Sequence, residues 1–152
     1  MRLNEITVSN AAGLEKTLDL MNLIELENSL NHFFINFCQM FFSSIPVASI
    51  PRAVWNYVVK NFTYQDDPVD EKLTAPKYLL TTRAGDCDDF ALFIKTVLTV
   101  FNIPSNYLLA GDENGFSHIV VILNDGTILD GTNNKFNFLD KTKYTKTAKV
   151  FL

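Results

Sequence analysis

Cys87, His118 and Asp130 are the residues whose types and order could carry out chemistry. A thiol, an imidazole and a carboxylate can act as nucleophile, base and orienting group in reactions at a carbonyl carbon. The thiolate attacks, the imidazole takes up and returns a proton, and the carboxylate fixes the imidazole tautomer. We therefore predict a catalytic triad of these three side chains.

Cys87 is predicted to lie in the first turn of a helix, because it follows a glycine-containing turn at residues 83–86 and precedes an apolar stretch with helical spacing. Unpaired backbone N–H groups and the positive end of the helix dipole favour a thiolate there. The backbone N–H of Cys87 is also the first expected oxyanion donor. Tyr64 and Trp55 are candidates for a second donor, although Trp55, inside an apolar helix, suits a core position better.

Three acidic residues, Asp86, Asp88 and Asp89, surround this thiol. Their negative charge raises the pKa of a neighbouring thiol and opposes the effect of the helix dipole. Their more common role is to cap a helix, and Asp86 with Asp89 three residues later has the spacing of a capping box. An ion pair between Cys87 and His118 would be needed to overcome the acidic surroundings.

The length of one hairpin loop decides whether His118 and Asp130 can meet. Successive side chains of a strand alternate between faces, so a two-residue loop would turn Asp130 away from the face of His118. A three-residue loop at residues 124–126 would place Asp130 opposite Val120 and on the face of His118. Because Gly126 stands where the longer loop needs a left-handed residue, we predict the three-residue loop.

The elements that position these residues change from helical to strand-like spacing after Pro104. Helical spacing covers residues 14–43, as one helix or two broken near 28–31, and then residues 51–61, 76–82 and 87–101. Strand-like spacing covers residues 107–110, 117–123, 127–131 and 146–152, and residues 65–73 read as a solvated loop. This order predicts an α+β fold in which the buried helix starting at Cys87 packs on a C-terminal antiparallel sheet.

The composition favours a single domain. A chain of 152 residues with 47% hydrophobic content can bury one core and is short for two. Within one compact domain we expect a helical extension over residues 1–48 and a catalytic core over residues 49–152. The net charge of −4 comes without the Lys/Arg clusters that nucleic-acid phosphates require, so we expect no nucleic-acid partner.

The chain shows no pattern of export or membrane insertion. Its first residues lack the order of a signal peptide, and the apolar run from Phe33 to Phe42 is too short to span a bilayer. We therefore expect no membrane partner and a cytoplasmic protein of a bacterial or phage-infected cell, or one associated with a virion. Cys38 and Cys87 are expected to be free thiols in a reducing compartment.

Two other interpretations of the triad residues stay open. The three side chains are competent metal ligands, but no CxxC or HxxxH spacing supports a metal or cofactor site, and we expect none. Alternatively, His118 is a hydrogen-bonded sheet histidine and Cys87 an inert buried thiol. Bound metal would favour the first of these interpretations, and a Cys87 buried away from His118 would favour the second.

The ordered pieces of residues 50–132 resemble the transglutaminase-like superfamily of cysteine enzymes with a papain-like fold. The pieces are an aromatic-ended helix at 54–64, Gly-Asp-Cys-Asp-Asp-Phe-Ala at 85–91, Asn-Ile-Pro at 102–104, Ser-His at 117–118 and Leu-Asp-Gly-Thr at 129–132. The resemblance implies Cys87 as nucleophile, His118 as base and Asp130 as orienting group. Tyr64 matches an aromatic residue often found near the site of these enzymes.

The chain also differs from the common pattern of that superfamily. Val120 replaces a tryptophan usually found two residues after the histidine, and Gly131 replaces a proline usually found after the aspartate. Asn106 stands where an arginine is common. Because the superfamily includes peptidases, amidases, crosslinking acyl transferases and inactive members, these differences bear on the pocket and on the type of reaction.

We expect a cysteine-dependent enzyme that acts on amide bonds of a peptide or protein substrate through a thioester, as a peptidase, amidase or acyl transferase. The alternative is a non-catalytic or weakly active binding module of a larger assembly such as a bacteriophage particle. That module would dock through the helix Phe33 to Phe42, whose aromatic residues cover more than one face. The same phenylalanines would also suit an ordinary core.

Overall fold

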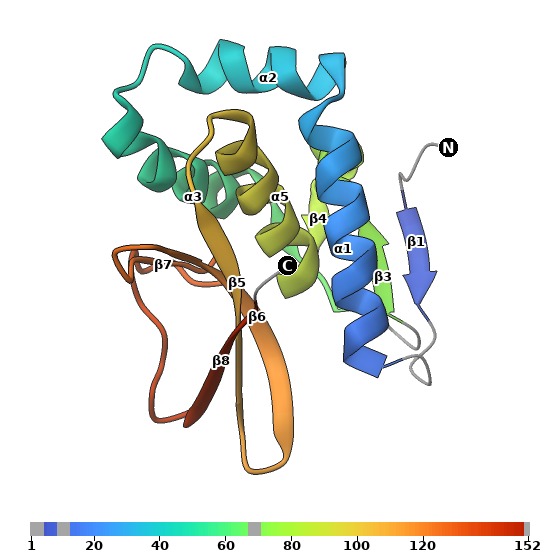
Figure 1. Ribbon diagram of the computed structural model, residues 1–152, viewed down its shortest axis with the longest axis vertical. Coiled ribbons are helices and arrows are strands. Elements are labelled where there is room, and N and C mark those ends of the chain that lie inside the picture. The colour runs from blue at the N-terminus through green and yellow to red at the C-terminus, as the bar shows by residue number, and fades with distance from the viewer. Residues whose placement is uncertain (1–4, 9–12, 67–70, 151–152) are drawn as a thin grey trace.

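The computed structural model describes residues 5–8, 13–66 and 71–150 (Figure 1). Its helices are α1 (Gly13–Ser29), α2 (His32–Phe42), α3 (Ile50–Asn61), α4 (Pro76–Thr82) and α5 (Cys87–Val100), with a 3-10 turn at Val47–Ser49. Its strands are β1 (Glu5–Val8), β2 (Thr63–Tyr64), β3 (Glu71–Thr74), β4 (Ala84–Gly85), β5 (Ser105–Asp112), β6 (Gly115–Leu123), β7 (Ile128–Leu129) and β8 (Lys146–Val150). This order confirms the predicted α+β class.

The C-terminal strands form an antiparallel sheet in the order β7-β6-β5-β8. Helix α5 packs against β6 and β5 of this sheet, while α1, α3 and α4 pack against α5 (Figure 1). Ten of the fourteen residues of α5 are buried, as a helix enclosed by neighbours requires. The helix that begins at Cys87 is therefore buried and packs on the antiparallel sheet, as predicted.

The phenylalanines of α2 divide between the core and the surface. Phe34 and Phe42 are buried, and the Phe34 ring meets Phe93 of α5 edge-on with centroids 5.6 Å apart. Phe33 and Phe41 are exposed. The inner half of α2 thus belongs to the core, which was one of the two roles that the sequence left open.

Helix α1 is tied to the core by a buried polar cluster around Glu25. Glu25 Oε2 accepts hydrogen bonds from Lys95 Nζ at 3.1 Å and Thr99 Oγ1 at 2.9 Å, and Oε1 accepts one from the Tyr107 hydroxyl at 3.3 Å. Burial, followed by the nearby Glu25 charge, raises the pKa of Tyr107. The cluster connects α1, α5 and β5, because its members come from all three.

Most predicted elements are confirmed, and the break between the first two helices falls at residues 30–31. The predicted solvated loop over residues 65–73 is wrong at its end, where β3 pairs antiparallel with β1. Residues 67–70 of that loop lie outside the described residues. A short parallel pair of β2 with β4 was also missed. Both pairs join segments far apart in the chain, and strands this short leave little periodicity to detect.

The described helices differ in length and hydropathy from a helix that crosses a membrane. No single helix in the described part of the chain has both the length and the hydropathy needed to cross a bilayer. The helix α2 together with residues 47–61 passes the same test only as a pair bent by 101°.

Candidate active site

The hairpin between β6 and β7 has the three-residue loop that the sequence predicts. Val121 pairs with Leu129, and the backbone N–H of Leu123 donates to the carbonyl of Thr127 at 2.9 Å. Residues 124–126 form the loop between that last pair, and Gly126 adopts the required positive φ of 92°. The same register, continued past β7, places Asp130 on the face of His118.

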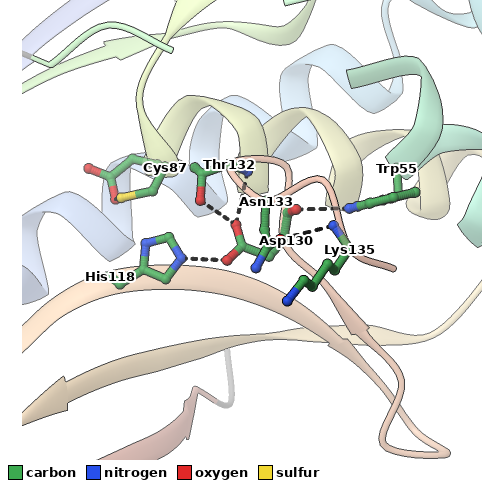
Figure 2. Close-up of polar contacts among 8 residues, drawn as sticks. Trp55, Cys87, His118, Asp130, Thr132, Asn133 and Lys135 are labelled. Atoms are coloured by element: carbon green, nitrogen blue, oxygen red, sulfur yellow. Dashed lines mark hydrogen bonds and ion pairs between the residues drawn. The ribbon is translucent and has the colours of Figure 1, made fainter. Parts of the chain in front are cut away.

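His118 and Asp130 are joined by a direct hydrogen bond. His118 Nε2 lies 2.8 Å from Asp130 Oδ2, and their side chains are only 8% and 5% exposed (Figure 2). An ionised carboxylate only accepts hydrogen bonds, so the bond assigns the imidazole hydrogen to Nε2. The Nδ1 atom of a neutral His118 then keeps the lone pair and can serve as the base.

Asp130 is held by four further donors, one of which is the backbone N–H of Asn133, which donates to the Asp130 carbonyl at 3.2 Å. Asp130 Oδ1 accepts hydrogen bonds from the backbone N–H of Thr132 at 2.9 Å and from the Thr132 hydroxyl at 2.7 Å. The Asp130 carbonyl also accepts one from the indole Nε1 of Trp55 at 2.8 Å (Figure 2). Asp130 lies just beyond β7, so these donors replace the strand pairing that would otherwise fix it.

Cys87 opens α5, and Figure 2 shows it at that helix end, on the side where His118 lies. The side chain of Cys87 is half-buried, and its sulfur lies 3.8 Å from Asp88 Oδ1. Both cysteines are free thiols, as predicted, and Cys38 is fully buried. Burial raises the pKa of the Cys38 thiol to about 12, so that thiol is protonated at neutral pH.

Two of the three acids around Cys87 cap the helix, as expected. Asp86 Oδ1 accepts hydrogen bonds from the backbone N–H groups of Asp88 and Asp89, at 3.2 and 3.4 Å. Asp89 completes a capping box through Oδ2 and also accepts the Thr74 N–H through Oδ1 at 2.7 Å. Their negative charge is therefore directed into backbone donors, whereas the Asp88 carboxylate faces the thiol.

Gly85, which has no side chain, leaves room for the Asp89 carboxylate in the capping box. A Cβ at this position would lie 2.7 Å from Asp89 Oδ2 and 2.8 Å from its Cβ. Gly85 also belongs to β4 and pairs with Tyr64 of β2, which fixes the turn before Cys87 to a second segment. The turn before Cys87 is therefore fixed in two ways, by the Asp89 carboxylate and by the pairing of β4 with β2.

The two candidates for a second oxyanion donor have different surroundings. The indole N–H of Trp55 is engaged by the Asp130 carbonyl and the ring is buried, so Trp55 supports the main chain of Asp130 and has no N–H left for an oxyanion. Tyr64 is half exposed, and its hydroxyl donates to Asp66 Oδ1 at 2.5 Å. That hydrogen bond and partial burial raise the pKa of Tyr64, so its phenol remains a neutral donor.

Two residues of the site were missed by the sequence reasoning. Thr132 could have been found, because a hydroxyl residue two positions after an aspartate often bonds back to its carboxylate in a turn. Tyr144 stacks on the imidazole of His118, with ring centroids 5.0 Å apart and planes 13° from parallel. An irregular segment separates the two rings in sequence, so no periodic signal connects them.

The side chains of Cys87, His118 and Asp130 are of types that can bind a metal ion. Within residues 5–8, 13–66 and 71–150, no group of three His, Cys, Asp or Glu side chains is arranged to hold a metal ion. The described site instead has the connected hydrogen bonds expected of an oriented imidazole.

A family model, described as the transglutaminase-like superfamily, matches residues 44–122, more than half of the chain. The chain belongs to this superfamily. Cys87 and His118 lie inside the matched region, while Asp130 and the segment that surrounds it follow the match. The membership confirms the resemblance seen in the sequence. No curated protein matches the chain.

Solved structures support the same fold. Legionella pneumophila LapG is similar with a TM-score of 0.56 and 20% identity, over 76% of this chain and 75% of that one. LapG in an EGTA-treated form gives a TM-score of 0.57 and 19% identity, over 81% and 76% of the two chains. A protein from Cytophaga hutchinsonii named as a candidate cysteine protease gives 0.55 and 20% identity over 75% of this chain. This chain spans only 41% of the Cytophaga protein's length.

Proposed function

We propose that this transglutaminase-like protein is a cysteine peptidase or a related amidase or acyl transferase, with Cys87 as nucleophile, His118 as base and Asp130 as orienting carboxylate. The observation that carries the proposal is the bond of 2.8 Å between His118 Nε2 and Asp130 Oδ2, beside the helix end that holds Cys87 (Figure 2). The similarity to a candidate cysteine protease supports the same chemistry.

Acylation follows from the roles of these atoms. The Cys87 thiol gives its proton to His118 Nδ1, and its sulfur forms a bond to the carbonyl carbon of a scissile amide. Asp130 keeps the hydrogen on Nε2 and stabilises the imidazolium that forms. The backbone N–H of Cys87, in the first turn of α5, is the first donor for the oxyanion. Tyr64 is our candidate for the second donor, since it lies on the strand paired with Gly85; its hydroxyl, which donates to Asp66 Oδ1 in this structure, would turn to the oxyanion.

The intermediate then divides into two products. As the C–N bond breaks, the His118 imidazolium protonates the leaving amine, and the acyl group remains on Cys87 as a thioester. Attack by water on the thioester would make the protein a peptidase or amidase. Attack by an amine would make it an acyl transferase. In both cases His118 takes the proton from the attacking molecule and returns it to the sulfur.

Site-resolved alkylation with iodoacetamide tests the proposal, because Cys38 serves as an internal control. Cys87 should react faster than Cys38 at neutral pH, since the Cys38 thiol is buried with a raised pKa. His118→Ala should slow the alkylation of Cys87 by about tenfold or more, because the thiolate loses its imidazolium partner. Equal rates at Cys87 in the two proteins would contradict the mechanism.

A second candidate function is a binding module, favoured by the exposed side of α2. Phe33 is 66% exposed and Met40 is 79% exposed, although large apolar side chains of this kind usually pack inside. Such a module would form a stable complex that Phe33→Ser and Met40→Ser weaken while the alkylation of Cys87 stays unchanged. A protein that stays monomeric and gains no partner would argue against this role.

A further inference from the structure

A polar cavity of about 480 Å³ adjoins the base on its carboxylate side. His118 and Asp130 are among the residues that line this cavity. The other walls come from the segment between β7 and β8: Thr132, Asn133, Asn134, Phe138, Asp140, Lys143 and Tyr144. Cys87 is not among the lining residues, so the cavity opens beside the base rather than beside the nucleophile. A molecule in the cavity would contact His118 without covering the thiol.

The walls of this cavity are fixed by hydrogen bonds within the segment. Asp140 Oδ1 accepts bonds from the Thr142 hydroxyl at 2.6 Å, from the Thr142 N–H at 3.0 Å and from the Lys143 N–H at 3.3 Å. The backbone N–H of Tyr144 donates to the Asp140 carbonyl at 2.8 Å. The turn therefore presents Lys143 and Tyr144 to the cavity from a defined backbone.

Hydrogen-bond donors remain available in these walls, while several acceptors are engaged. Both carboxylate oxygens of Asp130 have partners, and Asn133 Oδ1 accepts the Lys135 N–H at 2.9 Å. Within the described part of the chain, Lys143 Nζ makes no ion pair within 4 Å and no hydrogen bond; its charge attracts the nearby Asp140 carboxylate, and it lies 5.3 Å from the centre of the Tyr144 ring. The ammonium of Lys143 and the amide N–H₂ of Asn133 thus line a cavity in which the carboxylates of Asp130 and Asp140 already accept hydrogen bonds from other groups. Such a set of donors suits an added carboxylate.

The distribution of charge along the chain points the same way. Residues 131–152 contain five lysines and one aspartate, a net charge of +4. The 130 residues before them contain eight basic and sixteen acidic residues, a net charge of −8. The segment that walls the cavity is thus the basic part of an acidic protein. Of these lysines, Lys143 lines the cavity together with Asp130 and Asp140, so the ammonium of Lys143 is the charge there that can pair with an anionic group.

The position of the cavity identifies the part of the substrate that it would hold. His118 must hand its proton to the leaving amine, so the leaving group of a scissile amide lies next to the imidazole. We infer that the substrate is acidic on its leaving-group side and that Lys143 binds a carboxylate of the residue following the scissile bond. This inference rests on the proposed function, since it assigns a substrate class to the same site.

Paired peptide libraries test the inference. Two libraries should share one acyl side and carry either glutamate or lysine at the first position after the scissile amide. The wild-type protein should cleave the glutamate library about two- to fivefold faster, the difference expected of a single exposed charge pair, and added salt should reduce that ratio. Lys143→Glu should reverse the preference. Lys16→Glu on α1 changes the net charge equally and should leave it unchanged. Equal cleavage of both libraries, or a preference that Lys143→Glu does not alter, would overturn the inference.

A binding measurement separates this inference from the proposed function. The Cys87→Ala variant, titrated with the same two peptide libraries carrying a fluorescent label, should bind the glutamate library more tightly by fluorescence anisotropy. If the wild-type protein cleaves neither library while this preference persists and Lys143→Glu reverses it, the proposed function fails and the acidic-ligand site stands. If cleavage occurs and the binding preference is absent, the proposed function stands and the inference fails.

Discussion

Tyr144 lies flat on the imidazole of His118, with the two ring centroids 5.0 Å apart and the ring planes 13° from parallel. The Tyr144 ring keeps the imidazole from tilting out of its plane, so that Nε2 stays directed at Asp130. It also offers a π-surface to the imidazolium that forms when His118 takes a proton.

Replacing Tyr144 should therefore lower the reactivity of Cys87. Tyr144→Leu should slow the alkylation of Cys87 up to about tenfold, because a stacked pair contributes about 0.5–1.5 kcal/mol. Tyr144→Phe keeps the ring and should restore the wild-type rate. Rates of iodoacetamide alkylation between pH 5 and pH 9 measure the effect. If Tyr144→Phe behaved like Tyr144→Leu, the hydroxyl rather than the ring would be the active part.

Asp130→Asn should inactivate the protein without unfolding it. The new amide can turn its N–H₂ toward Nε2, which makes Nε2 an acceptor and moves the ring hydrogen to Nδ1. The base then has no lone pair facing the thiol, and the reactivity of Cys87 should fall by about 10²-fold or more. Alkylation kinetics, together with an unchanged circular dichroism spectrum, check this expectation. If the Asp130→Asn variant kept a reactive thiol, the carboxylate would not be what sets the tautomer.

Trp55→Phe tests whether the carbonyl of Asp130 needs its indole donor. The substitution keeps an aromatic ring in the core and removes one buried N–H, leaving the carbonyl without that partner. We expect a loss of unfolding free energy of about 1–3 kcal/mol and a slower reaction of Cys87. Denaturant unfolding measures the free energy of unfolding, and alkylation measures the reaction rate of Cys87. Tyr57→Phe, which removes a hydroxyl from the same helix, is the matched control and should leave the alkylation rate unchanged.

Gly85→Ala should weaken the turn that carries the thiol. A Cβ at this position would lie 2.7 Å from Asp89 Oδ2, so the carboxylate must leave its place in the capping box. We expect a cost of about 1–3 kcal/mol in the free energy of unfolding, from overpacking and from loss of the cap. Gly115→Ala is a useful comparison, since a Cβ there meets no atom within 4 Å and only its positive φ of 120° opposes the change.

Stability should fall at alkaline pH because of Cys38. Its thiol has a pKa of about 12 in the folded protein, above the reference value of 9.0, because burial disfavours the thiolate. A group with a raised folded-state pKa contributes stability that is fully present below the unfolded pKa and is lost as the pH rises toward the folded value. The contribution of Cys38 should therefore decline between pH 9 and pH 12. Urea unfolding of the wild-type and Cys38→Ala proteins across this range should show a smaller decline in the variant.

The sequence predicts the parts of this protein whose patterns are local. The capping box of Asp86 and Asp89, the helix that follows it and the three-residue loop ending at Gly126 all depend on neighbours within a few positions. From that loop alone the meeting of His118 with Asp130 could be worked out before any coordinates.

The remainder depends on contacts that local patterns do not record. Strands β1 and β3 are short, and the helices α1, α2 and α3 separate them in the sequence. Their alternation of apolar and polar residues therefore gives little signal of the pairing. The stacking of Tyr144 on His118 is set by the path of an irregular segment rather than by a period. Trp55 illustrates a third limit, since its type suggested a donor to the substrate while its position makes it a donor to the backbone of Asp130.

The hairpin between β6 and β7 makes the site depend on a length as much as on residue types. Leu123 and Thr127 close a loop of three exposed residues, and none of the three contacts His118 or Asp130 in the hydrogen bonds described. Deleting Asn124 alone would shift the register by one position and rotate Asp130 to the opposite face. A homologous chain could therefore keep every residue of the triad and still lack a working base, and inspection of identities alone would not reveal the loss.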